Sequence, residues 1–388
     1  MLANEGGGIS SVSRGLAHAL LKLEIETTIF ITTARPKTHV EKTGKYLKIV
    51  YLPMINLPPR SVWFLARYFH TISGLLKDYD LVHAVNPELA IGLTFFTSEL
   101  RRPLVTTLHG SNRAYLKAFL ELPARRWVQS DFAFHVLELP LHDMVTKRCI
   151  AKSNRTVVCS HTTLNELKTC EKSDVSKISV IYNGIDFDEI QGEDVTSHSG
   201  RGKGDELSMI YAGRLFWMKG ITFVLEAYDS LRKQFGNLHL RIFGRGPMKG
   251  EIEKFIANRR LKNEVYFGGF LPHQELIKEV KEADLVVFPS LYESQPMFAL
   301  EAMACQKPVV AFDLPYAREI IVNGKNGLLA KAYDLEDLCN KTSTALCDKN
   351  LRRSLGQNGY DYVKRNHDWD AQAGKYLKVY EALIADGK

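Results

Sequence analysis

Short apolar and β-branched runs alternate with helical patterns along almost the whole chain. A first set of predicted strands covers residues 27–33, 47–53, 80–85, 103–108, 132–137 and 156–160, and a second set covers 208–213, 238–244, 264–269, 284–290 and 308–313. Near-continuous apolar strands separated by helices are typical of parallel sheets that helices cover on both faces. Because ligands of such sheets bind where the strands end, we expect the functional residues in the loops that follow the strands.

A polar segment separates the two sets of strands. Residues 191–206, with the sequence QGEDVTSHSGRGKGDE, are rich in glycine and have no apolar face, which is typical of a linker. A chain of 388 residues is also too long for one ordinary hydrophobic core. We therefore predict an α/β fold with two domains, residues 1–190 and 205–365, and a final helix within residues 366–388.

The composition is that of an ordinary globular protein, with 45% hydrophobic and 24% charged residues. The net charge of +7 is too small an excess to indicate nucleic acid, so no such partner is expected. The six cysteines show neither CxxC nor His-paired metal spacing and are typical of reduced thiols in a cytoplasmic protein. No apolar run approaches the ~20 residues needed to span a bilayer, so no transmembrane anchor is expected. The sequence also shows no charged-then-apolar leader, so secretion is not expected.

Three glycines, Gly6 to Gly8, precede the first helical pattern in the stretch NEGGGISS. A glycine loop that leads into a helix lets an anionic ligand approach the helix N-terminus. Such a loop normally follows a buried strand, but the chain supplies only Met1, Leu2 and Ala3 for it. We therefore expect the first strand of the first domain to be missing, with a start truncated by about ten residues.

Two glutamates follow the predicted strand at 284–290, in the stretch PSLYESQPMFALEAMA of residues 289–304. The pattern predicts a short loop that carries Glu293, then a helix that begins near Pro296 or Met297, with Glu301 in its first turns. Carboxylates beside the unpaired N–H groups of a helix start are suited to a hydroxyl-rich ligand such as ribose or hexose. Alternatively, Glu293 is a solvated loop acid and Glu301 a surface helix residue; the spacing alone favours neither interpretation.

Basic side chains follow another strand of the second domain. Arg214 and Lys219 lie in the stretch YAGRLFWMKG, directly after the strand at 208–213. The planar Arg fork and the compact Lys charge are suited to a diphosphate, although solvated loop cations are the commoner case. His109 follows the strand at 103–108 of the first domain; a lone histidine is more often structural, but the strand end favours a functional role.

Two further patterns carry less weight. Gly244 and Gly246 lack the third glycine of a dinucleotide fingerprint, because Lys249 takes that position, and they fit a tight bend instead. Asp78 and Asp80 are spaced as in a metal-binding DxD pair. They precede a strand rather than follow it and so lie at the wrong edge of the sheet. No metal ion is therefore expected.

Four stretches of the chain resemble motifs of glycosyltransferase family 4, the retaining enzymes of the GT-B fold, and they follow one another along the chain as the motifs do in that family. They are ESQPMFALEAMA, YAGRLFWMKG, VIYNGID at 180–186 and PVVAFDLPYAREIIVNGKNGLL at 308–329. The resemblance runs from the glycine loop to the last helix and is densest in the second half. It implies two Rossmann-like domains that face each other across a cleft, with the C-terminal helix crossing back to the first domain.

The resemblance also implies roles for individual residues. Glu293 matches the first glutamate of the family's E-x7-E element, beside the donor sugar, and Glu301 matches the second, which binds the ribose. Arg214 and Lys219 match the basic pair that holds the donor diphosphate, and His109 resembles the histidine that contacts the donor sugar near the reacting centre. The remaining donor-binding positions implied in this way are Gly7, Gly8, Asn183, Gly213, Gly244, Met297, Phe298 and Ala299.

The chain departs from the family pattern at three loops. Ser294, Gln295, Pro296 and Met297 stand where Gly-Phe-Gly often follows the first glutamate. The usual Gly-Gly after PVV-x-x-D is replaced by the pair Pro315-Tyr316, and the usual GDGP is GRGP, with Arg245 in place of the acid. The first change is expected to alter which sugar hydroxyls are recognised, and the second affects how closely the backbone approaches a ligand at that loop. No catalytic role is expected for Arg245.

The expected function is transfer of a hexose from a nucleotide-diphosphate sugar to a glycan or lipid-linked acceptor, with retention and without a metal ion or cofactor. Such a role belongs to cell-surface polysaccharide or glycan biosynthesis in the cytoplasm. The alternatives are a non-catalytic nucleotide-sugar-binding subunit and another GT-B enzyme, such as a nucleotide-sugar epimerase. A dehydrogenase has only the weak glycine patterns in its favour.

Basic and aromatic residues are mixed in two stretches, at 61–76 and 101–127. Such a surface is suited to anionic lipid, as in peripheral enzymes at the inner face of a membrane. The alternative is a core helix whose Trp63, Phe64, Tyr68 and Ile72 pack inward, with a solvated basic rim. The pattern favours the core helix for 61–76 and leaves membrane contact as an expectation for 113–127.

Overall fold

The computed structural model describes residues 2–4, 8–33, 38–43, 45–53, 74, 76–85, 87–94, 102–121, 129–191 and 206–386. The chain divides into two compact units. Unit 1 comprises Met1–Lys117, Gln129–Gly184 and His367–Lys388, and unit 2 comprises Ile185–Asn366 with Ala118–Val128. The C-terminal helix is therefore part of the unit that also contains the start of the chain.

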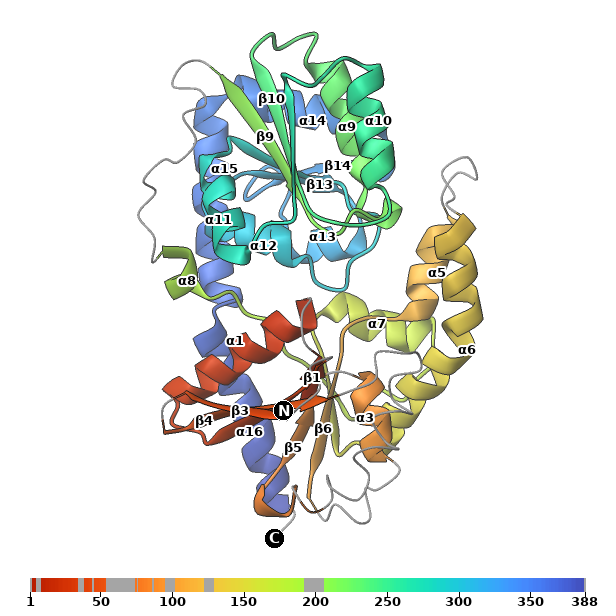
Figure 1. Cartoon of the computed structure of the whole chain (residues 1–388), viewed down its shortest axis with the longest axis vertical. Helices are drawn as coiled ribbons and strands as arrows, with labels where there is room; N and C mark the ends of the chain where they lie inside the picture. The colour runs from red at the N-terminus through yellow and green to blue at the C-terminus, as the bar shows by residue number, and fades with distance from the viewer. Residues whose placement is uncertain are drawn as a thin grey trace. The chain divides into compact units, whose positions relative to one another are not determined.

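Unit 1 contains a sheet of eight described strands in the order β3-β4-β2-β1-β5-β6-β7-β8 (Figure 1). Neighbouring strands are parallel except β3 and β4, which are antiparallel. The strands are β1 Leu2–Asn4, β2 Thr27–Thr33, β3 His39–Thr43, β4 Leu47–Pro53, β5 Val82–Ala84, β6 Leu104–Leu108, β7 Arg155–Val158 and β8 Ile178–Val180.

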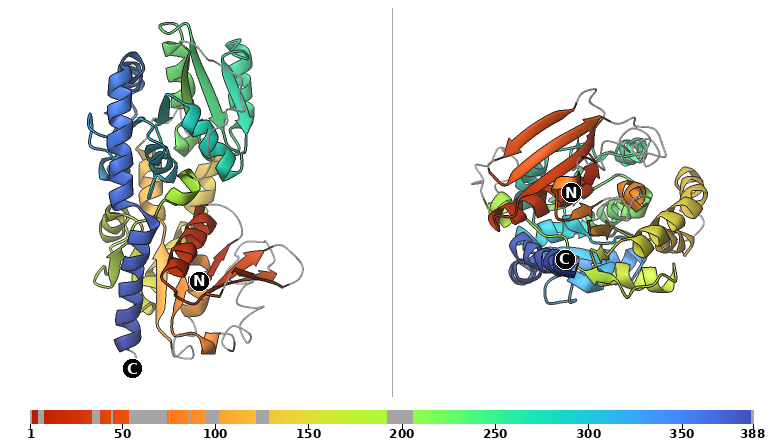
Figure 2. Two further views of the ribbon diagram at one scale, coloured as in Figure 1. Left: turned by 90° about the vertical axis from the view of Figure 1, so that its left-hand side faces the viewer. Right: turned by 90° about the horizontal axis from the view of Figure 1, so that it is seen from below.

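The described helices of unit 1 include two that share one apolar cluster with the sheet. The cluster joins Leu16 and Leu20 from α1, Val105 from β6, and Trp369 and Tyr376 from α16. Figure 2 shows α16 running beside the unit 1 sheet. The helical segments are α1 Gly8–Lys22, η1 Leu76–Asp78, α3 Pro87–Thr94, α5 Asn112–Leu120, α6 Gln129–Lys152, α7 His161–Thr169 and α16 Trp369–Asp386.

Trp369 packs where two glycines leave room for its ring. A Cβ atom on Gly15 of α1 would overlap the Trp369 indole, and a Cβ on Gly184 would overlap it as well. Only 6% of Trp369 is exposed. The absence of side chains at Gly15 and Gly184 therefore lets α16 close against α1.

A first strand is present, contrary to the expectation from the sequence. The three residues of β1 pair in parallel with β2, where Leu2 lies opposite Phe30, and Leu2 also lies opposite Ala84 of β5. The usual strand length led us to expect its loss. Three residues suffice here because neighbours on both sides pair with the backbone of β1.

The apolar run at 132–137 is helical, and its prediction as a strand is wrong. It lies inside α6, a helix of 24 residues. A short apolar run fits a buried strand and a helix segment equally well, and only the length of the surrounding pattern decides between them. Helical structure continues on both sides of this run, far beyond the usual strand length of ~5–6 residues.

Unit 2 contains a parallel six-stranded sheet in the order β11-β10-β9-β12-β13-β14. Helices cover both faces (Figure 1), and every residue of β12 and β13 is buried, which explains their unbroken apolar sequences. The strands are β9 Leu207–Ala212, β10 Leu238–Phe243, β11 Val265–Gly269, β12 Leu285–Phe288, β13 Val309–Phe312 and β14 Leu328–Ala330. The helical segments are α8 Phe187–Gln191, η3 Trp217–Lys219, α9 Ile221–Leu231, α10 Lys249–Asn258, α11 His273–Glu282, α12 Met297–Ala304, α13 Pro315–Ile320, α14 Leu335–Cys347 and α15 Lys349–Asn366.

Several segments named from the sequence lie outside the described residues. They are nearly all of the predicted linker 191–206, most of the aromatic stretch 61–76, the end of the basic stretch 101–127, and Gly7. The final helix predicted after Asp368 is present as α16.

Candidate active site

The strand order of unit 2 reverses between β9 and β12. The chain passes from β9 to β10 on one side and from β12 to β13 on the other, and β9 and β12 are direct neighbours. In doubly wound sheets, the loops that leave such a switch point diverge and leave room for a ligand at the carboxyl ends of the strands. Lys219 follows β9 and Glu293 follows β12, so the topology places both predicted residues at this point.

The two switch-point loops are joined by an ion pair. The Lys219 Nζ atom lies 2.7 Å from the Glu293 Oε2 atom, and the side chains are 19% and 12% exposed. The backbone N–H of Leu291 donates to the Met218 carbonyl oxygen at 2.8 Å, which ties the loops together beside the pair. The sequence predicted these two side chains separately, and the structure brings them into contact.

Gly220 holds the turn that presents Lys219. Its backbone is left-handed, with φ at 72°, and a Cβ atom there would overlap the Pro289 carbonyl oxygen of the neighbouring loop. Only glycine combines this conformation with so close an approach. The position of Lys219 against Glu293 therefore depends on the missing side chain at 220.

A second glycine contact supports the same turn. Gly244, at the end of β10, has φ at 143°, and a Cβ atom there would overlap the Gly213 carbonyl oxygen. The Leu215 N–H donates to the Arg245 carbonyl oxygen at 2.9 Å. The glycines predicted to allow a tight bend thus pack the loop after β10 against the loop after β9.

Arg214 lies in the loop that carries Lys219 but is more exposed. Its guanidinium carbon is 5.3 Å from the centre of the Phe216 ring, a cation–π contact that leaves the charge accessible. Arg245 makes a similar contact with Phe270, at 4.7 Å, after the neighbouring strand. Both cations stand at the carboxyl edge of the sheet.

The helix start next to Glu293 lies where the sequence predicted. Helix α12 begins at Met297, after Pro296. The Met297 N–H donates to the Gln295 carbonyl oxygen at 3.0 Å, so it is already bonded. Phe298 and Ala299 come next, and N–H groups in a first turn have no helical carbonyl to bond. Of the three backbone positions named from the sequence, these two remain suited to an anion.

Glu301 is held by a histidine that sequence reasoning missed. The His273 ring is 3.1 Å from the Glu301 carboxylate through Nε2 and 3.0 Å from the Glu189 carboxylate through Nδ1. The hydrogen bond to Glu301, aided by Glu189, raises the pKa of His273 to about 9. The sequence carried no signal for this bridge, because α8, α11 and α12 contribute one residue each.

His109 lies in unit 1, directly after β6. Its ring donates Nε2–H to the Val85 carbonyl oxygen at 2.9 Å, and burial lowers the pKa of His109 to about 4. The imidazole is therefore neutral near pH 7, with its lone pair on Nδ1. Asn183 is also in unit 1 and is buried, and Gly8 is the first residue of α1.

A second buried histidine supports β6, the strand that precedes His109. The His83 ring lies 2.7 Å from the Tyr380 hydroxyl and 2.7 Å from the Thr107 hydroxyl. Burial lowers the pKa of His83 to about 3, so the ring is neutral. His83 thus connects α16 to β6 through hydrogen bonds, and no pattern in the sequence indicates this role.

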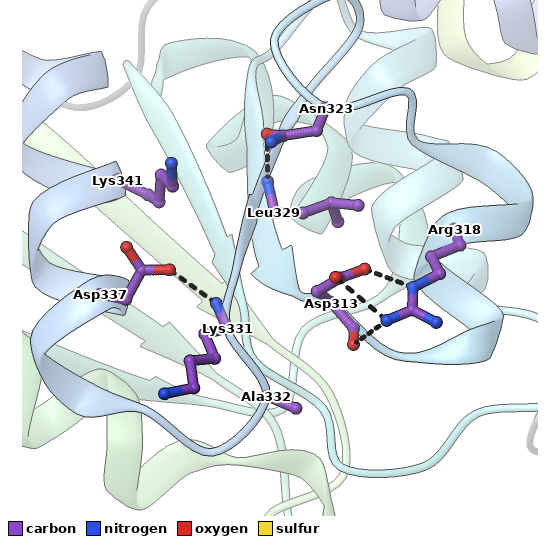
Figure 3. A pocket seen from close by; sticks show the side chains of 8 residues that line it. All are labelled: Asp313, Arg318, Asn323, Leu329, Lys331, Ala332, Asp337 and Lys341. Carbon is purple, nitrogen blue, oxygen red and sulfur yellow. Dashed lines mark hydrogen bonds and ion pairs between the residues drawn. The ribbon is translucent and has the colours of Figure 1, made fainter.

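A separate cavity of about 510 Å³ lies where β13 and β14 end (Figure 3). Two of its carboxylates are bonded: Arg318 pairs with Asp313 at 2.6 Å, and Asp337 accepts the Lys331 backbone N–H at 2.7 Å. None of the individual site residues proposed from the sequence lines this cavity.

In the ranges that the structure describes, no helix combines the length and the apolar character needed to cross a membrane. Nor does the described part of the chain gather three or more His, Cys, Asp or Glu side chains in the manner of a metal site.

Two family models match the chain over most of its length. The Glycosyltransferase Family 4 model matches residues 6–189, and the Glycosyl transferases group 1 model matches residues 196–362. An uncharacterised glycosyltransferase of Methanocaldococcus jannaschii is 26% identical over 396 residues, which cover 97% of this chain and 95% of the relative.

Solved structures show the same architecture. Sucrose-phosphate synthase from Thermosynechococcus elongatus has a TM-score of 0.77 at 21% identity, over 99% of this chain and 95% of that one. Anabaena HepE, solved in complex with UDP and glucose, has a TM-score of 0.73 at 18% identity, over 98% and 99%. The chain is therefore a glycosyltransferase of the family 4 and group 1 type, built on the GT-B fold.

Proposed function

We propose that this glycosyltransferase moves a hexose from a nucleotide-diphosphate sugar to a glycan or lipid-linked acceptor, with retention and without a metal ion. The observation that carries the proposal is the Lys219–Glu293 pair at the switch point of unit 2, with an ion-pair distance of 2.7 Å. A cation and a carboxylate in contact can serve the two halves of one ligand, its diphosphate and its sugar hydroxyls.

The cations of unit 2 serve the leaving group. When the bond between the sugar C1 and the phosphate oxygen breaks, negative charge develops on the departing diphosphate. The Lys219 ammonium and the Arg214 guanidinium stabilise this charge, together with two backbone N–H groups of α12, those of Phe298 and Ala299. This set supports a reaction in which protein groups, rather than a metal ion, stabilise the leaving diphosphate.

The carboxylates serve the neutral parts of the donor. Glu293 accepts hydrogen bonds from sugar hydroxyls, and Glu301 accepts them from the ribose. His273 contacts one oxygen of Glu301, Oε1, which leaves the other for a ribose hydroxyl. A carboxylate has about four acceptor positions, so each glutamate can keep its protein contact while it binds a ligand.

His109 contacts the donor sugar as a neutral acceptor. Its Nε2–H is used by the Val85 carbonyl, so Nδ1 is the atom that accepts from a sugar hydroxyl. Retention follows from attack on the face that the phosphate leaves. The acceptor oxygen bonds to C1, and its proton passes to the departing phosphate oxygen.

The similarity to a protein solved with UDP and glucose supports a nucleotide-sugar donor.

We place the reaction in the cytoplasm, as a step of cell-surface polysaccharide or glycan synthesis, with a peripheral contact between basic side chains and an anionic inner leaflet. Salt-sensitive sedimentation with anionic liposomes is the expected result for that contact, and absence of binding at low salt contradicts it.

A donor screen tests the proposal. UDP-, GDP- and ADP-sugars are compared by thermal shift, and turnover of the stabilising donor is then followed with and without EDTA. We expect one base class to raise the unfolding midpoint, EDTA to leave turnover unchanged, and NMR of the product to show a retained anomeric configuration. Lys219→Ala should abolish most turnover, whereas the exposed Lys254→Ala of α10 serves as the control.

Three outcomes would contradict the proposal. No stabilisation by any nucleotide diphosphate removes the donor assignment. Stabilisation with no transfer or hydrolysis of any donor identifies a non-catalytic nucleotide-sugar-binding subunit instead. Conversion of the free donor to an isomeric nucleotide sugar identifies an epimerase.

A further inference from the structure

The hydroxyl of Ser290 is buried beside the Glu293 carboxylate. Ser290 follows β12 and is 0% exposed. Its Oγ atom lies 2.9 Å from Glu293 Oε1, 3.3 Å from the Met218 carbonyl oxygen and 3.2 Å from the Tyr292 carbonyl oxygen. A hydroxyl has one proton to donate, and the charged oxygen is both the nearest and the strongest acceptor. Ser290 therefore donates to Glu293.

The backbone of Ser290 is held in turn by Tyr316. The Tyr316 hydroxyl donates to the Ser290 carbonyl oxygen at 2.6 Å, and Tyr316 is 3% exposed. Its ring packs edge-on against Phe288 of β12, with 6.3 Å between ring centres. Burial, reinforced by the charge of Glu293, raises the pKa of Tyr316 well above its usual value, so the hydroxyl remains a donor.

Tyr316 lies in the first turn of helix α13, one residue after Pro315. Pro315 opens the short helix α13, and this start directs the next side chain toward the loop that carries Ser290. Tyr316 therefore supports the backbone of the loop that carries Ser290 and Glu293.

We propose that Ser290 and Tyr316 are positioning residues for the transfer reaction: Tyr316 fixes the Ser290 backbone, and Ser290 aims one Glu293 oxygen while Lys219 holds the other. This inference rests on the proposed role of Glu293 at the donor sugar. It adds two residues that bind neither diphosphate nor sugar themselves. Both Glu293 oxygens then have a fixed protein donor, at 2.9 Å from Ser290 and 2.7 Å from Lys219.

Loss of either hydroxyl has a specific expected consequence. Without Ser290, the carboxylate can rotate about its side-chain bonds, and an error of about 1 Å in such a group costs up to ~10²-fold in rate. Binding of the diphosphate does not use Glu293. The effect should therefore fall on turnover of the whole donor and leave the affinity for the nucleotide alone unchanged.

The test removes one hydroxyl at a time. Ser290→Ala and Tyr316→Phe are compared with Thr342→Val and Tyr228→Phe. The control residues are also buried in unit 2, and Tyr228 likewise donates to a backbone carbonyl, that of Leu238. We expect Ser290→Ala to lower kcat at least 10-fold and Tyr316→Phe about 3-fold. The Kd for UDP, GDP or ADP, whichever base the chain binds, should stay within 2-fold, and both controls should keep their kcat.

The same substitution in a Glu293→Gln chain distinguishes a role in positioning Glu293 from a role in general structural stability. In a Glu293→Gln chain, adding Ser290→Ala should change kcat less than 2-fold, because the carboxylate that Ser290 aims is already gone. An equal loss in both backgrounds overturns the proposal. So does a Ser290→Ala chain in which the nucleotide Kd weakens by the same factor as kcat.

Crystal structures of the Ser290→Ala chain give a readout that does not depend on activity. The expected result is a Glu293 carboxylate displaced from its position 2.7 Å from Lys219 Nζ. A carboxylate that keeps this position overturns the inference even if the proposed function is correct. If instead the unsubstituted chain turns over no donor, the proposed function fails, and the crystal structures alone decide the geometry.

Discussion

The bridge that His273 makes between two carboxylates predicts a specific loss of stability at alkaline pH. The hydrogen bond to Glu301 and the interaction with Glu189 raise the His273 pKa from 6.5 to about 9. A raised pKa stabilises the folded chain fully below the unfolded value of 6.5. The contribution declines as the pH rises toward 9 and is absent above it.

The size of this effect is limited by solvent. One pKa unit corresponds to about 1.4 kcal/mol, so the shift sets an upper bound of about 3 kcal/mol. The His273 side chain is 42% exposed, however, and its partners Glu189 and Glu301 are 36% and 18% exposed. Ion pairs of this exposure contribute 1 kcal/mol or less, so we expect a loss of about 1 kcal/mol between pH 6 and 9.5.

Urea unfolding at these two pH values measures the loss. Other groups titrate in the same range, so the informative quantity is the difference between the unsubstituted chain and His273→Ala. His239→Ala is the control, because His239 is a partly exposed histidine of β10 whose nearest carboxylate lies 3.8 Å away. Equal pH dependence in the unsubstituted and His273→Ala chains would refute the bridge as a source of stability.

Three further predictions concern the two units separately. Lys219→Ala should lower kcat about 10²-fold or more while the unfolding midpoint changes by a few degrees; near-normal turnover contradicts the assignment. Gly220→Ala should destabilise the chain by about 2 kcal/mol or more, through left-handed strain and overlap with the Pro289 carbonyl; an unchanged urea midpoint contradicts this. The pKa values of His83, about 3, and His109, about 4, lie below the unfolded value, so stability should fall as the pH drops below 6.5. His83→Gln should flatten this slope in acid titrations, and an unaltered slope excludes His83 as its origin.

The fold was predictable where a local pattern was sufficient. The expected strand at 27–33 is β2, and the expected helix after Asp368 is α16. A run of apolar residues carries no information about the elements that pack beside it. The sequence therefore did not predict the short strand β1 or the helical conformation of residues 132–137. In both cases the neighbours decide the conformation: two flanking strands for β1, and the long surrounding helix for 132–137.

The candidate site was predictable where topology gathers residues. Lys219 and Glu293 each follow a parallel strand, and the carboxyl ends of parallel strands share one edge, so their proximity follows from the pattern. His273 and Ser290 could not be found in this way. Their roles depend on side-chain directions from separate elements, which neither spacing nor residue type reveals.

The packing of α16 against α1 determines the order in which the chain can fold during synthesis. Unit 1 is discontinuous, because four residues of α16 complete an apolar cluster that otherwise comes from the first 181 residues; they are Trp369, Ala373, Tyr376 and Tyr380. Domains often fold from the N-terminus as the ribosome releases them. Here the residues of unit 2 all emerge before α16, so unit 2 can complete its folding first. Until α16 is released, one face of the unit 1 sheet remains uncovered. The long-range closure by α16 is then a late and slow step.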